Sequence, residues 1–301
     1  MTTAVATPFR FFSLQVVTTR RLGPSLVRVT FAGPDLRAFR SDGCDQSLSL
    51  FLPHPGQSEP VVTLERGWGS PHSGEAVSEG GWWQGWRELP DDVRAVMRSY
   101  TLRALRTDAE GHTTEVDIDF VLHGIGPDTS LRAGPASRWA ARAAAGDRVL
   151  LLGPAVADNR AIRFRPPEDT DLILLWADET ALPATAAVLE SLPAGTRARV
   201  WLEVPHYGDI QDLASAADTE ITWFVRDGSP HTQDSPMALD SLRTAELAPA
   251  ERPYVWIAGE SGHVKQLRRH FVGERGIDRR RVTFVGYWRH GMTEEQLREQ
   301  G

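Results

Sequence analysis

The residues with the most evident chemistry stand together at positions 98–103, which read Arg-Ser-Tyr-Thr-Leu-Arg. Side chains alternate between the two faces of a β-strand, so a strand here would place Arg98 and Tyr100 on one face and Ser99 and Thr101 on the other. A guanidinium beside a flat ring suits a phosphate and a planar ligand, and a neighbouring hydroxyl can bond a ring nitrogen. This chemistry would hold a flavin with a diphosphate tail. An exposed strand with solvated arginines is the alternative.

A second candidate phosphate site is the sequence Gly134-Pro135-Ala136-Ser137, which begins a predicted helix. Backbone N–H groups at a helix N-terminus are unpaired and attract anions. Gly134 would let a ligand approach closely, and Ser137 carries a hydroxyl; a plain serine N-cap is the alternative. His123 lies at the end of the predicted strand that precedes this helix. It could donate a hydrogen bond to the flavin or to its phosphate; a hydrogen-bonded structural histidine is the alternative.

In the second half of the chain, polar residues follow predicted strands. Ligands of open α/β sheets bind outside the carboxyl ends of the strands. Asp178, Glu179 and Thr180 follow the first of these strands, and the two acids either cap the next helix or bond a nicotinamide amide or ribose. Glu203 ends the next strand, where it either accepts a bond from an adenosine ribose or is solvated. The Gly-x-Gly-x-x-Gly fingerprint is missing at this point of the chain.

Two later segments complete the set of candidates. Gly259 and Glu260 end another predicted strand, directly before Ser261, which is a good helix N-cap. Residues 286–291 follow the last strand and read Gly-Tyr-Trp-Arg-His-Gly. In a two-domain flavoprotein this end can fold back so that Trp288 covers a ring face and the next residue, an arginine, brings positive charge. A tail that packs on its own domain is the alternative.

Two patterns of elements would position these residues. Residues 9–53 contain short strands separated by Gly/Pro turns, and a clean alternation covers 115–122, which is typical of an antiparallel barrel or sandwich. Beyond the polar stretch 158–168, apolar runs typical of strands buried on both faces alternate with helical stretches, as in a mostly parallel sheet. We predict a two-domain, all-β plus α/β fold, with a barrel over 9–157 and an α/β domain over 168–301.

Residues 67–85 are rich in glycine, serine and tryptophan, which indicates a loop excursion from the barrel. The tryptophans of this region either cap the barrel or face a flat ligand. They are Trp68, Trp82, Trp83 and Trp86. The sequence Leu-Pro-Asp-Asp at 89–92 predicts a helix start, with proline in the first turn and acids at its positive end.

Composition excludes several classes of protein. Among 301 residues, Cys44 is the only cysteine, so an intramolecular disulfide and a four-thiolate iron–sulfur or zinc site are excluded. The net charge of −7 gives no overall bias toward nucleic acid or an anionic membrane. The N-terminus lacks an apolar signal core, and no window approaches the ~20 apolar residues of a membrane span, so we expect a cytoplasmic protein.

These motifs resemble the siderophore-interacting protein family of ferric-siderophore reductases. The correspondence runs in order from about residue 10 to 291, at 98–103, 119–124, 134–140, 146–147, 153–154, 178–184, 203–205, 259–260 and 286–291. The resemblance implies a ferredoxin-reductase-like architecture, in which the FAD-binding barrel precedes an NAD(P)H-binding domain whose C-terminal tail lies over the flavin.

The resemblance also implies roles for single residues. Arg98, Ser99, Tyr100 and Thr101 would hold FAD, with Tyr100 against the ring and Thr101 near its reactive nitrogen, which makes these two the candidate catalytic residues. His123 and residues 134–137 would complete the FAD site. NADPH or NADH would lie along the second-domain residues, which are Asp178, Glu179, Thr180, Glu203, Gly259 and Glu260.

One departure concerns the substrate. The family often reads Asp-x-His-Val-Lys-Leu before its first long loop, and the lysine helps to bind an anionic siderophore. Here residues 45–50 read Asp-Gln-Ser-Leu-Ser-Leu, so Ser47 and Ser49 stand at the histidine and lysine positions and one cation is missing. The chain also has extra length at 125–133. The candidate substrate cations are Arg103, Arg132 from this extra segment, and Arg289.

The implied activity is a two-stage electron transfer, in which NADPH or NADH reduces FAD and FAD reduces the Fe(III) of a bound siderophore. Iron arrives chelated, so the chain needs no metal site of its own. An FAD-dependent oxidoreductase with another acceptor, a quinone or a redox protein, is the enzyme alternative. A protein that binds a ferric siderophore but does not reduce it is the non-enzyme alternative. We expect a monomer that binds no nucleic acid and inserts into no membrane.

Overall fold

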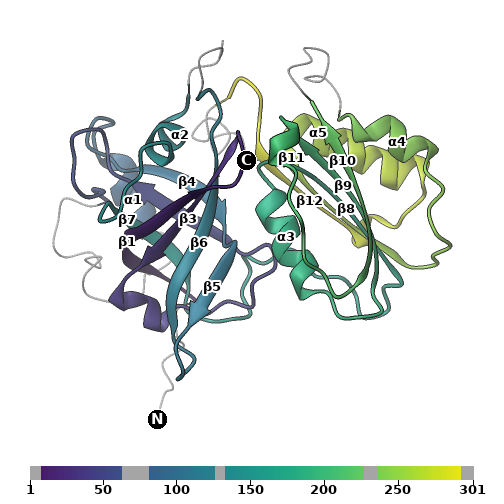
Figure 1. Ribbon diagram of the computed structural model, residues 1–301, viewed down its shortest axis with the longest axis horizontal. Coiled ribbons are helices and arrows are strands. Elements are labelled where there is room, and N and C mark those ends of the chain that lie inside the picture. Colours follow the sequence, from purple (N-terminus) through teal and green to yellow (C-terminus); the bar gives the residue numbers. More distant parts are fainter. Residues whose placement is uncertain (1–7, 63–80, 126–132, 227–235, 293–301) are drawn as a thin grey trace. The chain divides into compact units, whose positions relative to one another are not determined.

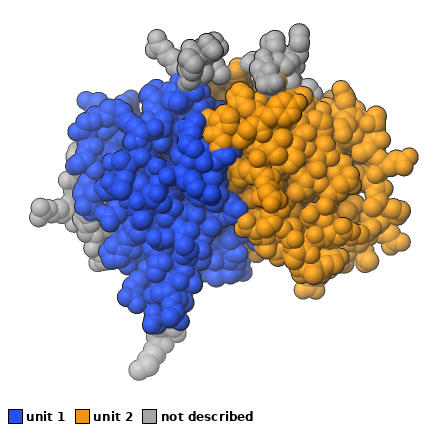
Figure 2. All heavy atoms as spheres, in the orientation of Figure 1, with its two compact units in different colours: residues 1–22, 26–162 blue, residues 23–25, 163–301 orange. Residues whose placement is uncertain are grey.

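The computed structural model describes residues 8–62, 81–125, 133–226 and 236–292. The chain forms two compact units, one of residues 1–22 with 26–162 and one of residues 23–25 with 163–301 (Figure 2). It passes from the first to the second between Ile162 and Arg163. Within the described parts, no helix has the length and apolar character needed to cross a membrane.

Unit 1 is built on one seven-stranded antiparallel sheet in the order β4-β3-β7-β1-β2-β6-β5 (Figure 1). The strands are β1 (Phe9–Arg21), β2 (Leu26–Ala32), β3 (Ser47–Leu52), β4 (Val96–Thr101), β5 (Ala104–Thr107), β6 (Thr113–Val121) and β7 (Arg148–Pro154). A 3₁₀ turn, Pro34–Ala38, follows β2. Most of these strands match the predicted ones, and the four-residue β5 is the one that apolar alternation did not predict.

Strands β4 and β5 lie at opposite edges of this sheet, although only Leu102 and Arg103 separate them in sequence. Leu102 N donates to the carbonyl of Gln46, beside β3 (2.9 Å), and Arg103 N donates to the carbonyl of Asp117 in β6 (2.9 Å). Two residues span only about 7 Å, so the sheet must curl until its two edges approach. The predicted antiparallel barrel is therefore confirmed as a curled half-barrel.

The core of unit 1 fills the inside of this curl. Phe12, Phe31, Phe39 and Phe120 are fully buried there, as the alternation of apolar residues along the strands requires. A short helix, α2 (Pro135–Ala140), adds the nearly buried Trp139 to the same cluster.

A tryptophan-bearing helix, α1 (Gly81–Glu88), covers a second apolar cluster of this sheet. Trp86 is buried in it, donates from Nε1 to the carbonyl of Ala95 (3.1 Å) and stacks on Trp83 with ring centroids 5.1 Å apart. The loop predicted over 67–85 is thus wrong over 81–85, where α1 begins, and the helix predicted to start at 89–92 is wrong because a turn lies there. Burial of Trp86 outweighs the low helix propensity of glycine. Trp68 lies outside the described residues.

The carboxylates of β6 are tied to its two neighbouring strands. Arg28 of β2 forms a two-pronged ion pair with buried Asp119 (2.6 and 2.8 Å). Arg106 of β5 holds Asp117 in the same way (2.9 and 2.7 Å), and the hydroxyl of Thr30 also donates to Asp117 (2.7 Å). Burial alone would raise the pKa of Asp117, but the bonds from Arg106 and Thr30 lower it overall.

Unit 2 is a five-stranded parallel sheet in the order β10-β9-β8-β11-β12. The strands are β8 (Leu172–Asp178), β9 (Arg197–Val204), β10 (Asp218–Val225), β11 (Pro253–Glu260) and β12 (Val282–Trp288), and the helices are α3 (Leu182–Ser191), α4 (Ala238–Thr244) and α5 (Ser261–Arg269). A π-turn, His270–Glu274, extends α5, and 3₁₀ turns cover Tyr207–Asp209 and Arg279–Arg281. The predicted α/β domain with a mostly parallel sheet is confirmed.

The apolar strands of unit 2 are covered by helices (Figure 1). The central strand β8 is buried throughout, which explains its continuous apolar sequence. Trp176 and Trp201 are fully buried in a cluster with residues of α4 and α5, whereas α3 packs against β8 separately.

We expect Asp117→Asn to lower the free energy of unfolding at pH 7 by about 2 kcal/mol, because Arg106 and Thr30 would lose a charged acceptor. The folded-state pKa of Asp117 is lowered, so its stabilisation is present above the unfolded-state pKa of about 3.9 and is lost as the pH falls through the folded-state pKa. Urea unfolding of both proteins should therefore give curves that converge below about pH 4. The exposed Asp92→Asn is the control, and a gap of equal size in acid would contradict this assignment.

Candidate functional site

Four aromatic side chains connect the predicted flavin strand β4 to helix α2. The ring centroid of Tyr100 in β4 lies 4.4 Å from that of Phe120 in β6. Phe120 lies 5.7 Å from Trp139 in α2, which in turn stacks on Phe31 at 6.3 Å. We call these four residues the aromatic row. It holds together the three segments that carry the sequence-predicted flavin residues of unit 1.

The alternation predicted for residues 98–101 is confirmed. Tyr100 is half-buried against the barrel core, so Arg98, two residues earlier, lies on the same face. Ser99 and Thr101 lie on the other face, and Thr101 is nearly buried. Arg98 donates from Nη1 to the carbonyl of Met97 (2.7 Å). The strand ends at Thr101, so the last two residues of the motif form the crossing to β5 rather than a continued strand.

The face that carries Ser99 and Thr101 is rich in hydroxyls. In the antiparallel register of β3 and β4, Ser47 pairs with Thr101 and Ser49 pairs with Ser99. Directly opposed residues of such strands have Cβ atoms about 5 Å apart. These four residues therefore form one uncharged hydroxyl face, which includes Ser49 at the position of the family's lysine.

The start of α2 is held by its third helical residue. Gly134 is the N-cap and Pro135 begins the helix, with no side chain capping it. Ser137 is not the N-cap, so the plain serine cap is wrong; its hydroxyl instead donates to the carbonyl of Val121 at the end of β6 (2.9 Å). Ala136 is buried in the core. A Cβ added to Gly134 would meet no atom of the described residues within 4 Å, so none of these residues covers the helix start.

These residues fit a flavin. His123 is exposed in the turn that follows β6, two residues after the strand end that Ser137 bonds. The guanidinium of Arg98, the half-buried ring of Tyr100 and the open helix start at Gly134 supply a cation, a flat surface and backbone N–H groups around the aromatic row. That these residues contact FAD stays a prediction.

The carboxyl edge of the sheet in unit 2 is centred on the buried carboxylate of Asp178. Its Oδ1 accepts hydrogen bonds from the backbone N–H (2.9 Å) and the hydroxyl of Thr180. Its Oδ2 accepts from Glu260 N (2.7 Å) and Trp288 Nε1 (2.8 Å). Burial and then the neighbouring Glu179 raise the pKa of Asp178, against the hydrogen bonds it receives. One carboxylate thus joins the ends of β8, β11 and β12.

Gly259 and Glu260 complete this junction. Gly259 has φ +146°, and a Cβ there would lie 2.6 Å from Cγ of Asp178, so only glycine fits. Glu260 is the N-cap of α5 and accepts from the backbone N–H groups of Gly262 and His263. The predicted N-cap, Ser261, is therefore wrong by one residue; its hydroxyl donates to the carbonyl of Trp288 (2.8 Å).

A cation that sequence reasoning missed balances the second acid of this edge. Arg226 follows β10 and pairs with the buried carboxylate of Glu179. Burial disfavours the charge of Arg226, but Glu179 raises its pKa overall. Its position directly after a strand at the carboxyl edge was the signal that could have found it. Glu179 is thus paired with an arginine and does not cap the next helix, whose N-cap is Ala181.

The side chain of Glu203 points into the protein interior. It is almost fully buried, and its Oε1 accepts from Trp176 Nε1 (3.1 Å) and from the backbone N–H of Ala238 at the start of α4 (2.9 Å). Burial raises the pKa of Glu203, while these bonds oppose the rise. The alternative of a solvated strand-end acid is therefore wrong. A bond to a ribose stays a prediction.

The chemistry of this edge suits part of a nicotinamide nucleotide. Carboxylates accept hydrogen bonds from ribose hydroxyls and carboxamide N–H groups, but they repel a diphosphate. Asp178, Glu179, Glu203 and Glu260 are already bonded to donors of unit 2, and any acceptor capacity that they still offer suits the ribose and nicotinamide rather than the phosphates. Trp288 is bonded to this edge, as expected for a tail on its own domain, and its contact with the flavin stays a prediction.

The three candidate substrate cations lie in different parts of the chain. Arg103 is half-buried at the crossing between β4 and β5 in unit 1. Arg289 is exposed in the turn after β12 in unit 2. Arg132 lies outside the described residues. Contact of any of them with a substrate stays a prediction.

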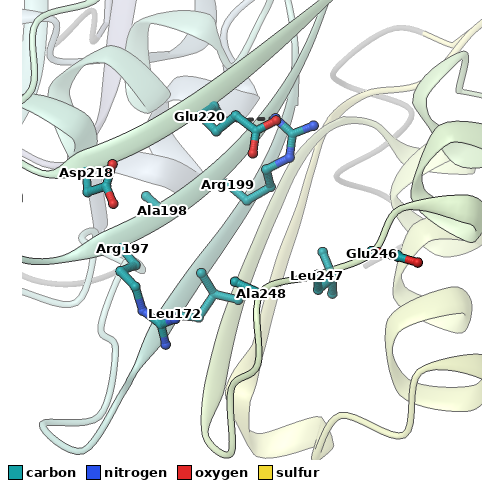
Figure 3. Close-up of a pocket in the computed structure, with 9 residues that line it drawn as sticks. All are labelled: Leu172, Arg197, Ala198, Arg199, Asp218, Glu220, Glu246, Leu247 and Ala248. Atoms are coloured by element: carbon teal, nitrogen blue, oxygen red, sulfur yellow. Dashed lines mark hydrogen bonds and ion pairs between the residues drawn. The ribbon is translucent and has the colours of Figure 1, made fainter.

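A cavity of about 160 Å³ opens at the other end of the sheet in unit 2 (Figure 3). Leu172, Arg197 and Asp218 line it from the amino-terminal ends of β8, β9 and β10, and Arg199 pairs there with Glu220 (3.0 Å). Its size is below the several hundred Å³ of ordinary ligand pockets, and it lies away from the strands' carboxyl ends. We assign it no part in nucleotide binding.

Gly259→Ala should destabilise unit 2 by about 3 kcal/mol, because the new methyl group would both strain the backbone and displace the Asp178 carboxylate. Gly195→Ala is a matched control: Gly195 also has positive φ (+87°), but its Cβ would meet no atom within 4 Å. That control should cost only about 1 kcal/mol. Urea unfolding followed by tryptophan fluorescence measures both, and equal losses would contradict the close contact.

Comparisons with known proteins match the two parts of the chain separately. A family model described as "Siderophore-interacting FAD-binding domain" matches residues 15–158, and one described as "Siderophore-interacting protein" matches residues 170–291. The ferric vibriobactin reductase of Vibrio cholerae is 28% identical over 95% of this chain and 92% of its own. The NADPH-dependent ferric-chelate reductase of Escherichia coli is 28% identical over 94% of this chain and 95% of its own.

A solved structure extends the likeness to the fold. The siderophore-interacting protein SipS of Aeromonas hydrophila is 32% identical, with a TM-score of 0.70 over 97% of this chain and 96% of its own. The order of the half-barrel and the parallel sheet, the motifs at 98–101 and 134–137, and both family models agree. The chain therefore belongs to the siderophore-interacting protein family.

Proposed function

We propose that this protein is an FAD-dependent NAD(P)H ferric-siderophore reductase, which reduces siderophore-bound Fe(III) and so releases Fe(II). The observation that carries the proposal is the aromatic row, which gathers Arg98, Tyr100 and the start of α2 in the part of the chain matched as a siderophore-interacting FAD-binding domain. Two relatives that span nearly the whole chain are named as ferric reductases.

Unit 1 would supply most of the residues that hold the flavin. Arg98 would pair with a phosphate, the ring of Tyr100 would lie against the flavin, and Thr101 would bond its reactive nitrogen. His123 and residues 134–137 would enclose the remaining phosphate oxygens. When bound, FAD supplies the step between a two-electron hydride donor and a one-electron metal acceptor.

NADPH or NADH would bind at the carboxyl edge of unit 2. Asp178 fixes Thr180 and Glu260 at this edge through hydrogen bonds, so it sets the shape on which the nicotinamide would rest. Trp288, held by the same carboxylate, would contribute a flat surface beside the flavin. These residues orient the nucleotide and need to move no proton.

The substrate would be a ferric siderophore, taken up as a small molecule by a cytoplasmic monomer. Oxygen ligands built for Fe(III) hold Fe(II) less tightly, so reduction releases the metal without a protein metal site. Arg103, Arg132 and Arg289 would attract the chelate where the family's lysine is replaced by Ser49. This replacement also favours a second candidate, an FAD-dependent oxidoreductase with a quinone or a redox protein as acceptor.

Anaerobic mixing separates these candidates. NADPH or NADH should bleach the flavin absorbance of the purified protein, and a ferric siderophore should restore it. Restoration by a quinone but by none of a panel of ferric siderophores would favour the second candidate. Protein that stays colourless after incubation with FAD would overturn both and leave a non-catalytic binding protein.

Tyr100→Leu should weaken FAD binding about tenfold or more, because stacking of one aromatic ring contributes roughly 1–2 kcal/mol. Flavin released from the denatured protein, and fluorescence titration of the apoprotein with FAD, measure the loss. Tyr207→Leu, at a residue that is 71% exposed in unit 2, is the control and should keep its flavin. Full FAD occupancy in Tyr100→Leu would refute the placement of the flavin on β4.

A further inference from the structure

The charge of this chain is unevenly distributed. The whole sequence has 33 lysines and arginines against 40 acids, yet residues 261–290 contain eight cationic residues and only two acidic ones. These thirty residues form α5, the turns after it and β12. A strongly basic segment in an acidic chain indicates a local surface for a negatively charged partner.

Two of the eight cations have structural roles. Arg275 donates from Nη2 to the carbonyl of Ala245 (2.9 Å) and so closes the C-terminal end of α4. Arg281 pairs with Asp169. Both are only partly exposed, so neither accounts for the basic character of the surface.

Five other cations are exposed, on α5 and on the turn that precedes β12. Their side chains form no ion pair with any residue that the structure describes. Three belong to α5 at the spacing i, i+3, i+4, which places them on one helix face. Two begin the 3₁₀ turn that leads directly into β12. They are Lys265, Arg268, Arg269, Arg279 and Arg280.

The elements that carry these cations adjoin β12, an edge strand of the sheet (Figure 1): α5 packs on this strand, and the 3₁₀ turn leads into it. The start of α5 packs closely on this strand, since a Cβ on Gly286 would lie 2.5 Å from Oγ of Ser261. Further along, the guanidinium of Arg268 lies 4.6 Å from the ring centroid of Phe284, which is 46% exposed. We call β12 and the five exposed cations the basic edge.

Edge strands are often protected from aggregation by charged side chains on the strand itself. The basic edge has five cations, and the exposed aromatic ring of Phe284 stands among them rather than being replaced by a polar residue. Protection alone would not require this excess. The combination of an available strand edge, an apolar anchor and surrounding cations is what recognition of an acidic strand requires.

We propose that the basic edge docks a segment of another protein that is rich in Asp and Glu and that adds to β12 as a further strand. The backbone of β12 would supply main-chain hydrogen bonds, Phe284 an apolar contact and the five cations the selectivity for acids. A lipid surface could use the charges but not the strand edge. A second copy of this chain that paired β12 with β12 across a two-fold axis would bring the two sets of five cations together, and their like charges would repel.

The probe is a fluorescein-labelled peptide of about ten residues with alternating glutamate and valine, the pattern of a half-buried strand. We expect it to bind the full-length protein in a salt-dependent manner, and a peptide with lysine in place of glutamate not to bind. N-methylation of alternate residues removes main-chain donors and should abolish binding. The readout is fluorescence anisotropy, which is independent of the reductase reaction.

Two triple variants with the same charge change test the place of binding. The basic-edge variant should bind the peptide about tenfold more weakly or worse, and the control variant, at exposed arginines of unit 1, should bind normally. The basic-edge variant is Arg268→Gln, Arg269→Gln and Arg280→Gln, and the control is Arg20→Gln, Arg87→Gln and Arg142→Gln.

Four results would overturn the proposal. Equal affinity of the basic-edge variant and the control variant for the peptide would show that the peptide does not bind at the basic edge. Full binding by the N-methylated peptide would exclude strand addition. Tighter binding to vesicles of phosphatidylcholine and phosphatidylglycerol than to the peptide would assign the edge to a membrane. The fourth result combines two observations: the unsubstituted protein does not bind the peptide, and the basic-edge variant self-associates in sedimentation velocity. Together they would show that these arginines only protect the edge strand from association.

Discussion

The two-residue connection between β4 and β5 is the constraint on which unit 1 depends. Because Leu102 and Arg103 join the two opposite edges of one sheet, the sheet has to curl, and β4 is brought across from β3 to β6. Tyr100 can then meet Phe120, and Phe120 can meet Trp139. The proposed flavin site is thus a consequence of chain closure: Arg98 and Tyr100 share β4, and the curl brings this strand to β6 and to the helix start at Gly134, which lie farther along the chain.

Unit 2 depends on a different physical arrangement, in which carboxylates are buried and satisfied at the ends of parallel strands. Asp178 accepts four hydrogen bonds, Glu179 pairs with Arg226, and Glu203 anchors the start of α4. Burying these groups is unfavourable unless the donors are fixed in place. These acids therefore fix the shape of the edge and expose little negative charge there. The charge of Glu179, for example, is neutralised within the protein by Arg226. An edge rich in acids is thus compatible with the binding of an anionic nucleotide.

The sequence predicted the two sheets and most strands because apolar periodicity reports burial directly, as in the continuous run of β8 and the alternation of β6. It did not predict α1, since its stability comes from burial of Trp86 under a glycine-rich sequence, or β5, whose four residues owe their place to pairing with β6. The inward turn of Glu203 was also hidden, because its partners are a backbone N–H and an indole from other segments. Motif spacing locates functional residues but not the direction in which a buried acid points.

The same reasoning bears on what the net charge of −7 means for an anionic substrate. Several acids lie in the interior, and Asp117, Asp119 and Glu179 are each matched by an arginine, so they contribute little field at the surface. The remaining charge is unevenly distributed, with eight cationic residues against two acidic ones over 261–290. Attraction of an anionic chelate or of an acidic protein is therefore decided by local clusters. Ser49 stands where the family has a lysine, so the hydroxyl face of β3 and β4 has no cation at this position. Recognition of an anionic chelate at this face therefore has to rely on hydrogen bonds, and positive charge has to come from elsewhere in the chain.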